Sequence, residues 1–111
     1  MYYVYMLRCT GGALYTGIAA DLEKRLRQHA ARGAACAKYT RSHPPQALAA
    51  AWQTDDHAAA ARLEVLLKQL RAPKKRALVA GETTPQALFG QRLGQKSYVR
   101  VPCEGYGALF D

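Results

Sequence analysis

The N-terminal segment alternates apolar runs with turn residues in the pattern of a β-hairpin. Residues 2–8 are rich in β-branched and aromatic side chains, residues 9–12 carry turn chemistry, and residues 13–18 resume the apolar pattern. Because successive side chains of a strand point to opposite faces, Tyr5 and Met6 should face opposite sides of the sheet. The pattern predicts two antiparallel strands joined by this turn.

A helical period replaces the strand pattern directly after the hairpin. Asp21 is a suitable N-cap, and residues 22–31 carry an apolar stripe at i, i+4 and i+8, formed by Leu22, Leu26 and Ala30. Gly33 is expected to stop this helix. Arg25 and His29 are also four residues apart, so they share a neighbouring face, just off the apolar stripe.

The pattern is weaker in the middle of the chain. Residues 34–46 are interpreted as a connection that ends in two prolines. The run at 47–53 is ambiguous, because its alanines favour a helix whereas its short length and the prolines before it permit a strand. We assign a strand there, partly on the family resemblance described below.

Two further helices are predicted in the second half. Asp55 or Asp56 caps a helix over residues 57–70, whose buried stripe comprises Leu63, Leu66, Leu67 and Leu70. Pro73 suits the first turn of the next helix, which Gly81 closes.

The length of 111 residues suits one compact domain. We divide it into a core domain at 1–81 and a C-terminal extension at 82–111, which is expected to pack on the same domain. Within the extension a helical turn is expected at 84–90, and residues 91–111 show no clear period.

Charge and cysteine content narrow the class of protein. The formal net charge of +8 suggests a polyanionic partner, although a basic surface that only keeps the protein soluble is an alternative. Three cysteines at long spacings argue against a disulfide framework or a structural zinc site. The N-terminus has no secretory pattern and no apolar run reaches membrane-spanning length, so we expect a cytoplasmic protein, monomeric and without a membrane partner.

Few residues offer the chemistry of phosphodiester hydrolysis, which needs an activated water, neutralised phosphate oxygens and a stabilised leaving oxygen. Glu64 is the one acid in the middle of a patterned helix, which makes it a candidate metal ligand, but on spacing alone an i, i+4 ion pair with Lys68 is the favoured interpretation. A tyrosine serves as a base only where neighbouring cations lower its pKa. Taken singly, these residues leave the catalytic and the structural interpretations open.

The ordered set of motifs is more specific than any of its members. It resembles the GIY-YIG nuclease family in three segments, YVY at 3–5, YTG at 15–17 and DLEKRLRQH at 21–29. Tyr3 stands where the family usually has glycine. The stretches AKYTR at 37–41 and LKQLRAPKKRALV at 67–79 are similar to the small, stand-alone YhbQ-like branch. The resemblance covers roughly residues 2–80.

The resemblance implies both a fold and a site. The fold is α/β, of the α+β kind, with a small three-stranded antiparallel sheet flanked by helices. The chemistry is hydrolysis with one Mg²⁺ or Mn²⁺ ion, with roles carried by Tyr5 and Tyr15 at the water site, Arg25 on the phosphate, His29 in proton transfer and Glu64 on the metal. Many active members have an asparagine or another polar residue after the glutamate. This chain contains no asparagine.

Two classes of function therefore remain, a metal-dependent DNA nuclease and a catalytically weak nucleic-acid-binding module on the same scaffold. The joint presence of Tyr, Arg, His and Glu favours the enzyme. Exposed tyrosines suit stacking on unpaired bases, so a single-stranded or branched DNA is favoured over a specific duplex site. The expected nucleic-acid contacts are Lys24, Arg32, Lys38, Tyr39, Arg41, Lys68, Lys74 and Lys75.

Overall fold

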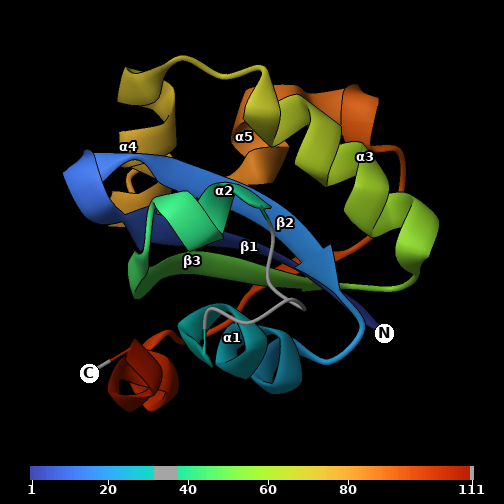
Figure 1. The fold of residues 1–111 in the computed structure, drawn as a ribbon. Helices are drawn as coiled ribbons and strands as arrows, with labels where there is room; N and C mark the ends of the chain where they lie inside the picture. Colours follow the sequence, from blue (N-terminus) through green and yellow to red (C-terminus); the bar gives the residue numbers. More distant parts are fainter. Residues whose placement is uncertain (32–37, 111) are drawn as a thin grey trace.

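The computed structural model describes residues 1–31 and 38–110, which form a central antiparallel sheet between two layers of helices (Figure 1). The strand order is β2-β1-β3-β4. The strands are β1 (Tyr2–Cys9), β2 (Leu14–Ala19), β3 (Pro45–Thr54) and β4 (Tyr98–Arg100). The helices are α1 (Leu22–Ala31), α2 (Lys38–Ser42), α3 (His57–Lys68), α4 (Ala72–Ala80) and α5 (Pro85–Phe89), with short 3-10 segments η1 (Thr10–Gly12), η2 (Gly90–Leu93) and η3 (Glu104–Phe110).

The sheet has four strands, so the expected three-stranded sheet is one strand short. The extra strand, β4, pairs with β3 through Trp52 and Arg100. The Arg100 guanidinium lies over the Trp52 ring, 5.4 Å from the ring centroid, and donates hydrogen bonds to the Leu78 and Val79 carbonyls at the end of α4. A strand of three residues is too short to produce a readable alternation, and long-range pairing with β3 forms it.

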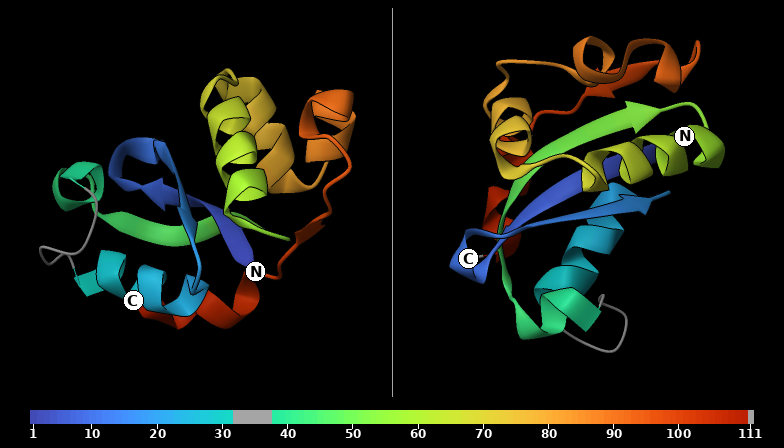
Figure 2. Two further views of the ribbon diagram at one scale, coloured as in Figure 1. Left: turned by 90° about the vertical axis from the view of Figure 1, so that its right-hand side faces the viewer. Right: turned by 90° about the horizontal axis from the view of Figure 1, so that it is seen from above.

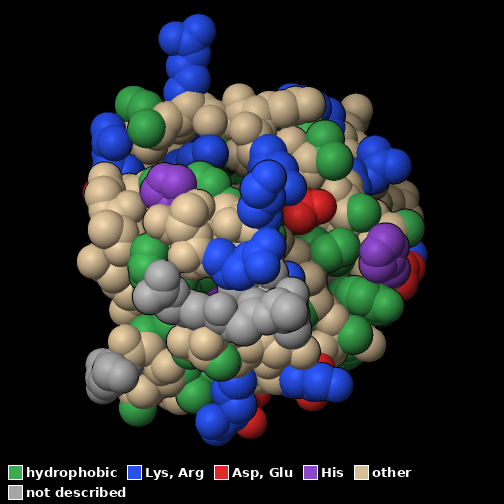
Figure 3. Space-filling view, in the orientation of Figure 1, with side chains coloured by type: hydrophobic (Ala, Val, Ile, Leu, Met, Phe, Trp, Pro, Cys, Tyr) green, Lys and Arg blue, Asp and Glu red, His purple; other side chains and the backbone are tan. Residues whose placement is uncertain are grey.

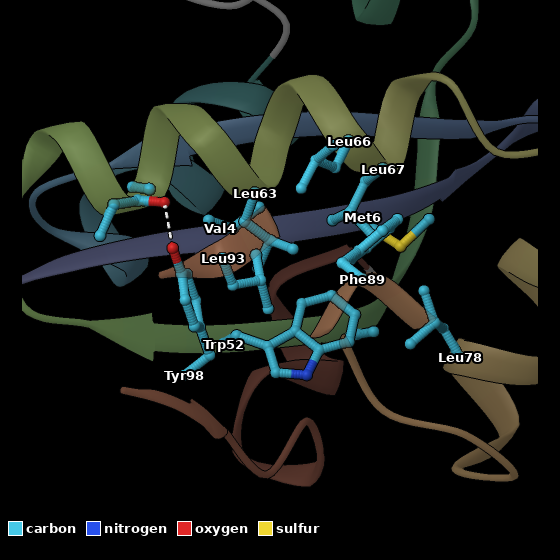
Figure 4. Packing of buried hydrophobic residues seen from close by; sticks show 13 residues of the cluster. Val4, Met6, Trp52, Leu63, Leu66, Leu67, Leu78, Phe89, Leu93 and Tyr98 are labelled. Atoms are coloured by element: carbon cyan, nitrogen blue, oxygen red, sulfur yellow. Dashed lines mark hydrogen bonds between the residues drawn. The ribbon is translucent and has the colours of Figure 1, made fainter. Parts of the chain in front are cut away.

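One face of the sheet packs against α3, α4 and α5, as two perpendicular views agree (Figure 2). Val4 and Met6 of β1 meet the leucines of α3 in this cluster, and the Tyr98 hydroxyl donates to the Ala59 carbonyl at 2.8 Å (Figure 4). The alternation predicted for β1 is confirmed, because Tyr5 belongs to the cluster on the other face.

The opposite face is covered by α1 and by the C-terminal η3 (Figure 2). Tyr5 and Leu7 pack here against Leu22 and Leu26, with Phe110 at the margin. Both faces of the central strand β1 are thus buried, and small alanines of β3 let the helices approach closely.

Most predicted elements agree with the structure. The hairpin, α1, β3 and α3 begin and end within a few residues of their predicted limits. Asp56 caps α3 by accepting from the Ala59 amide, and Gly81 closes α4 with φ of 78°. The expected connection at 34–46 instead contains α2, and the expected helix stop at Gly33 lies outside the described residues. None of the helices within 1–31 and 38–110 is long and apolar enough to cross a membrane.

Candidate active site

A buried chain of hydrogen bonds links three elements on the α1 side of the sheet. The Tyr5 hydroxyl, from β1, lies 2.8 Å from Nε2 of His29 in the last turn of α1. Nδ1 of the same ring lies 2.9 Å from the hydroxyl of Thr40 on α2. All three side chains are essentially inaccessible to solvent. Both imidazole nitrogens therefore have a partner, which fixes the orientation of the ring.

His29 lies deeper than its position beside the apolar stripe suggested. The buried positions of α1 are Leu22, Leu26 and His29, whereas Ala30 is only half-buried. The expected position of His29 just off the buried stripe is therefore wrong, because its imidazole is part of the packed interior. His29 can be buried in place of Ala30 because Tyr5 and Thr40 supply hydrogen-bond partners for its two ring nitrogens.

Two residues of β2 complete the surroundings of the Tyr5 hydroxyl. The centroid of the Tyr15 ring lies 5.5 Å from that of the His29 ring and 6.4 Å from that of the Tyr5 ring. Gly17 pairs with Tyr5 across the sheet, and a Cβ at Gly17 would lie 2.5 Å from the Tyr5 hydroxyl. Glycine is therefore required at this position for the phenol to approach the backbone.

The pKa of Tyr5 is raised from its ordinary value to about 12. Burial is the main cause; a hydrogen bond from Arg25 opposes it, and the charges of Tyr15 and Glu64 add to the rise. Neighbouring cations were expected to lower this pKa. The opposite holds because desolvation outweighs Arg25, so the phenol is protonated in the resting protein.

The pKa of His29 is lowered to about 4, first by burial and then by the charge of Arg25. At neutral pH the imidazole is neutral and has one N–H. The arrangement that gives the phenol proton an acceptor has Arg25 donating to the Tyr5 oxygen, the Tyr5 O–H donating to Nε2, and Nδ1–H donating to Thr40.

Arg25 is half-buried on α1, at the edge of this hydrogen-bonded chain. Its Nη1 donates to the Gln28 side chain at 2.9 Å, which orients the guanidinium. A shallow hollow beside it is lined by Lys24, Arg25 and Gln28 of α1 and by residues 18–21, from the end of β2 to Asp21. An anion in this hollow would lie against two cationic side chains.

Glu64 is carried by α3, the helix that packs on the opposite face of the sheet and against β2. Its carboxylate is 22% exposed and lies 3.4 Å from the Lys68 ammonium, so the predicted i, i+4 ion pair is present. Its charge nevertheless acts on the Tyr5 phenol across the sheet edge. Glu64 is thus near the site and already paired with a cation.

The oxygen groups here suit a hard divalent ion. Glu64 offers a partly exposed carboxylate, and Thr16 of β2 has a buried hydroxyl without a hydrogen-bond partner among the described residues. Thr16 lies opposite Met6, on the sheet face that α3 covers. Within residues 1–31 and 38–110, no three acidic, His or Cys side chains cluster as a ready-made metal site. A metal at Glu64 would therefore take most of its ligands from water and substrate.

The expected nucleic-acid contacts are distributed unequally around this site. Lys and Arg side chains gather in the middle of the face that α2, β2 and α3 share (Figure 3). Five of the expected contacts are exposed on α1, α2 and α3, namely Lys24 on α1, Lys38, Tyr39 and Arg41 on α2, and Lys68 on α3. Lys74 and Lys75 lie on α4, where Lys75 faces the β1–β2 turn and not the Tyr5–His29 pair. Arg32 lies outside the described residues.

A larger surface hollow than the one beside Arg25 lies elsewhere and contains no candidate site residue. It is shallow, mostly apolar, and lined by Ala58, Ala61, Arg62, Val65, Leu66 and Arg92. We place the site at the Tyr5–His29 pair despite this, because hydrolysis needs titratable groups in contact, which the apolar hollow lacks.

Thr40 was not identified as functional from the sequence, and for Gly17 the sequence indicated only that a ligand or neighbour could approach the backbone closely. Thr40 lies within the KYTR stretch, but its role depends on a contact with His29 eleven positions away. Gly17 is part of the second half-motif, and only the strand register shows that it faces Tyr5.

Comparisons with known proteins identify the family of this chain. The model of the GIY-YIG catalytic domain matches residues 1–77. A UPF0213 protein of Xanthomonas axonopodis is 36% identical over 100 residues, covering 90% of this chain and 94% of that protein. A UPF0213 protein of Cupriavidus necator is 38% identical over 80 residues, covering 71% of this chain and 84% of that protein.

A solved structure is also similar, the solution NMR structure of the UPF0213 protein BH0048 from Bacillus halodurans. It is 36% identical, covers 82% of this chain and 96% of that one, and has a TM-score of 0.48. The family match spans β1 to α4 and includes Tyr5, Tyr15, Arg25, His29 and Glu64. The chain therefore belongs to the GIY-YIG family of nuclease domains, in its small YhbQ-like, UPF0213 branch.

Proposed function

We propose that this protein is a metal-dependent nuclease that hydrolyses phosphodiester bonds in DNA. The observation that carries the proposal is the buried chain of hydrogen bonds from Arg25 through Tyr5 and His29 to Thr40. A module that only binds nucleic acid needs surface charge, not a buried chain of proton-transferring groups beside an arginine.

Tyr5 and His29 act together as the base in this proposal. The Tyr5 oxygen accepts a proton from the attacking water while its own proton passes 2.8 Å to Nε2 of His29. The phenol never has to exist as a free phenolate, which its pKa of about 12 disfavours. Thr40 keeps Nδ1 protonated, so that Nε2 stays free to accept.

Arg25 couples substrate binding to this base. Its charge is the second cause of the low pKa of His29, after burial. A phosphodiester anion held by the guanidinium offsets that charge, and the pKa of His29 then rises toward neutrality. The imidazole thus becomes a stronger base when substrate is present.

Glu64 would hold the divalent ion, with water and substrate oxygens as the other ligands. When bound, Mg²⁺ or Mn²⁺ would neutralise the phosphate and stabilise the leaving oxygen. The substrate form follows from the surface. Tyr39 and basic residues flank the site, which favours single-stranded or branched DNA over a sequence-specific duplex.

We expect Glu64→Ala to abolish cleavage while binding of DNA is kept, because the carboxylate serves the metal and not the DNA. Glu82→Ala, an exposed glutamate in the turn after α4, is the matched control. Labelled single-stranded, duplex and branched DNA are incubated with each variant and Mg²⁺, Mn²⁺ or EDTA. Full activity of the Glu64 variant would refute the metal role. Binding without cleavage of any substrate by the wild type would favour the alternative, a binding module.

A further inference from the structure

A stack of three aromatic rings leads from the buried site to the surface. The rings of Tyr15 and Tyr39 lie 5.9 Å apart and within 15° of parallel. Those of Tyr39 and His43 lie 4.3 Å apart and within 9° of parallel. Tyr15 contacts His29 at the inner end, whereas His43 is exposed at the outer end. Neither Tyr39 nor His43 takes part in the proton transfer proposed above, and His43 has no role in the proposed function.

The outer ring is held in place by its own helix. The His43 amide donates to the Tyr39 carbonyl at 2.9 Å, and Nδ1 of His43 lies 3.3 Å from the same oxygen. The Ser42 hydroxyl, 3.1 Å from Nδ1, is a further partner. A ring fixed in this way loses little conformational freedom when a ligand stacks on it.

The His43 side chain is exposed at the end of α2. Within the described residues, Tyr39 contributes the one ring that stacks on His43, and it covers the inner face. Lys38 and Arg41 are exposed on the same short helix, in a chain of net charge +8. A flat aromatic surface with cations beside it matches a nucleobase and its phosphates.

We propose that the exposed face of His43 is a stacking site for one unpaired base of the DNA strand whose scissile phosphate lies at Arg25. This rests on the proposed nuclease function and adds a subsite to it. A paired base in a duplex is already stacked on both faces, so it cannot occupy this position without unstacking. The subsite therefore predicts a preference for single strands or for unpaired branches.

The test is an abasic scan. Fluorescence anisotropy in EDTA measures the affinity of short single-stranded DNAs that lack one base at successive positions. The wild type should lose roughly 5- to 20-fold in affinity at one position. That position should lie at a constant distance from the bond that is cut when Mn²⁺ is added.

Variants separate stacking from charge. His43→Ala should reduce the abasic penalty to less than about 2-fold, whereas His43→Phe, which keeps a flat ring, should retain it. His57→Ala, an exposed histidine at the start of α3, is the matched control and should retain it too. A flat scan in a wild type that binds and cuts DNA, or an unchanged penalty in His43→Ala, overturns the subsite alone. A wild type that binds no DNA overturns both proposals.

Discussion

His29 is buried between a phenol and a hydroxyl, and this environment sets its chemistry. The side chains that face it are Tyr5 and Tyr15 from the sheet, Arg25 from its own helix and Thr40 from α2. Burial and the positive charge of Arg25 both disfavour the protonated ring. The imidazole is therefore neutral across the physiological range, and protonation must be driven by substrate.

The free energy of unfolding should decrease at low pH, because the unfolded chain takes up a proton at His29 before the folded protein does. Its folded pKa of about 4 lies below the unfolded value of 6.5, so the unfolded chain binds the proton more tightly between these values. The stabilising contribution is complete above pH 6.5 and decreases as the pH falls toward 4. Urea unfolding at pH 7 and pH 4.5 should show a loss of about 2 kcal/mol from this group.

A variant that cannot be protonated isolates the contribution of His29. His29→Gln should make the free energy of unfolding less dependent on pH in this interval, whereas His57→Gln, at an exposed position, should behave like the wild type. An identical pH dependence in His29→Gln and the wild type would contradict the assignment.

Among the elements, the β1–β2 hairpin has the tightest constraint on its sequence. Tyr5 and Gly17 are register partners, and the phenol lies directly over the glycine. Strand pairing thus places the Tyr5 hydroxyl between β2 and α1, where Arg25 and His29 reach it. The hairpin register is as much a part of the site as the side chains are.

Gly17→Ala should therefore damage both stability and activity. The new methyl group would lie 2.5 Å from the Tyr5 hydroxyl and 3.2 Å from the Tyr15 ring, so both rings must move. We expect a loss of about 1–3 kcal/mol in the free energy of unfolding. Cleavage should decrease further, because the Tyr5–His29 contact shifts.

Gly105 supplies the matched control, because a Cβ there meets no atom within 4 Å. Gly105→Ala should melt within a few degrees of the wild type and cleave DNA normally. The two variants are compared by thermal unfolding and by the rate of cleavage at saturating Mn²⁺. Equal melting temperatures and equal cleavage rates in the two variants would show that the close approach of Tyr5 to Gly17 matters for neither stability nor activity.

For the molecule as a whole, the C-terminal residues complete both layers. Phe89, Leu93 and Tyr98 join the cluster beneath α3, while Tyr106 and Phe110 pack on the α1 side. The chain beyond the family match thus buries apolar surface on both faces of the sheet. The exposed surface is left with an excess of basic side chains.

This basic surface predicts a strong salt dependence of DNA binding. Twelve of the sixteen Lys and Arg residues lie between Lys24 and Arg76. Each phosphate contact on a single strand should add about −0.7 to the slope of log affinity against log salt. Affinities measured from low to physiological salt should therefore decrease steeply. A flat dependence would remove the nucleic-acid interpretation.

The sequence by itself determined the main helices and the hairpin, because their signals are local. Asp56 accepts from an amide three residues away, and Gly81 adopts the positive φ that ends α4. Spacing also placed Arg25 and His29 on neighbouring parts of one helix, and the half-motifs brought Tyr5 into the same hypothesis. Contacts within a few residues can be read from composition and period.

Tertiary structure alone decided the fourth strand, the partners of His29 and the acidity of the site. β4 forms on the edge that β3 leaves free, and Thr40 of α2 comes within hydrogen-bond distance of His29 on α1. The neighbouring arginine suggested a lower pKa for Tyr5, but the pKa is raised. Burial between strand and helix destabilises the phenolate more than Arg25 stabilises it. Desolvation and strand pairing depend on residues distant in the chain, so no local pattern encodes them.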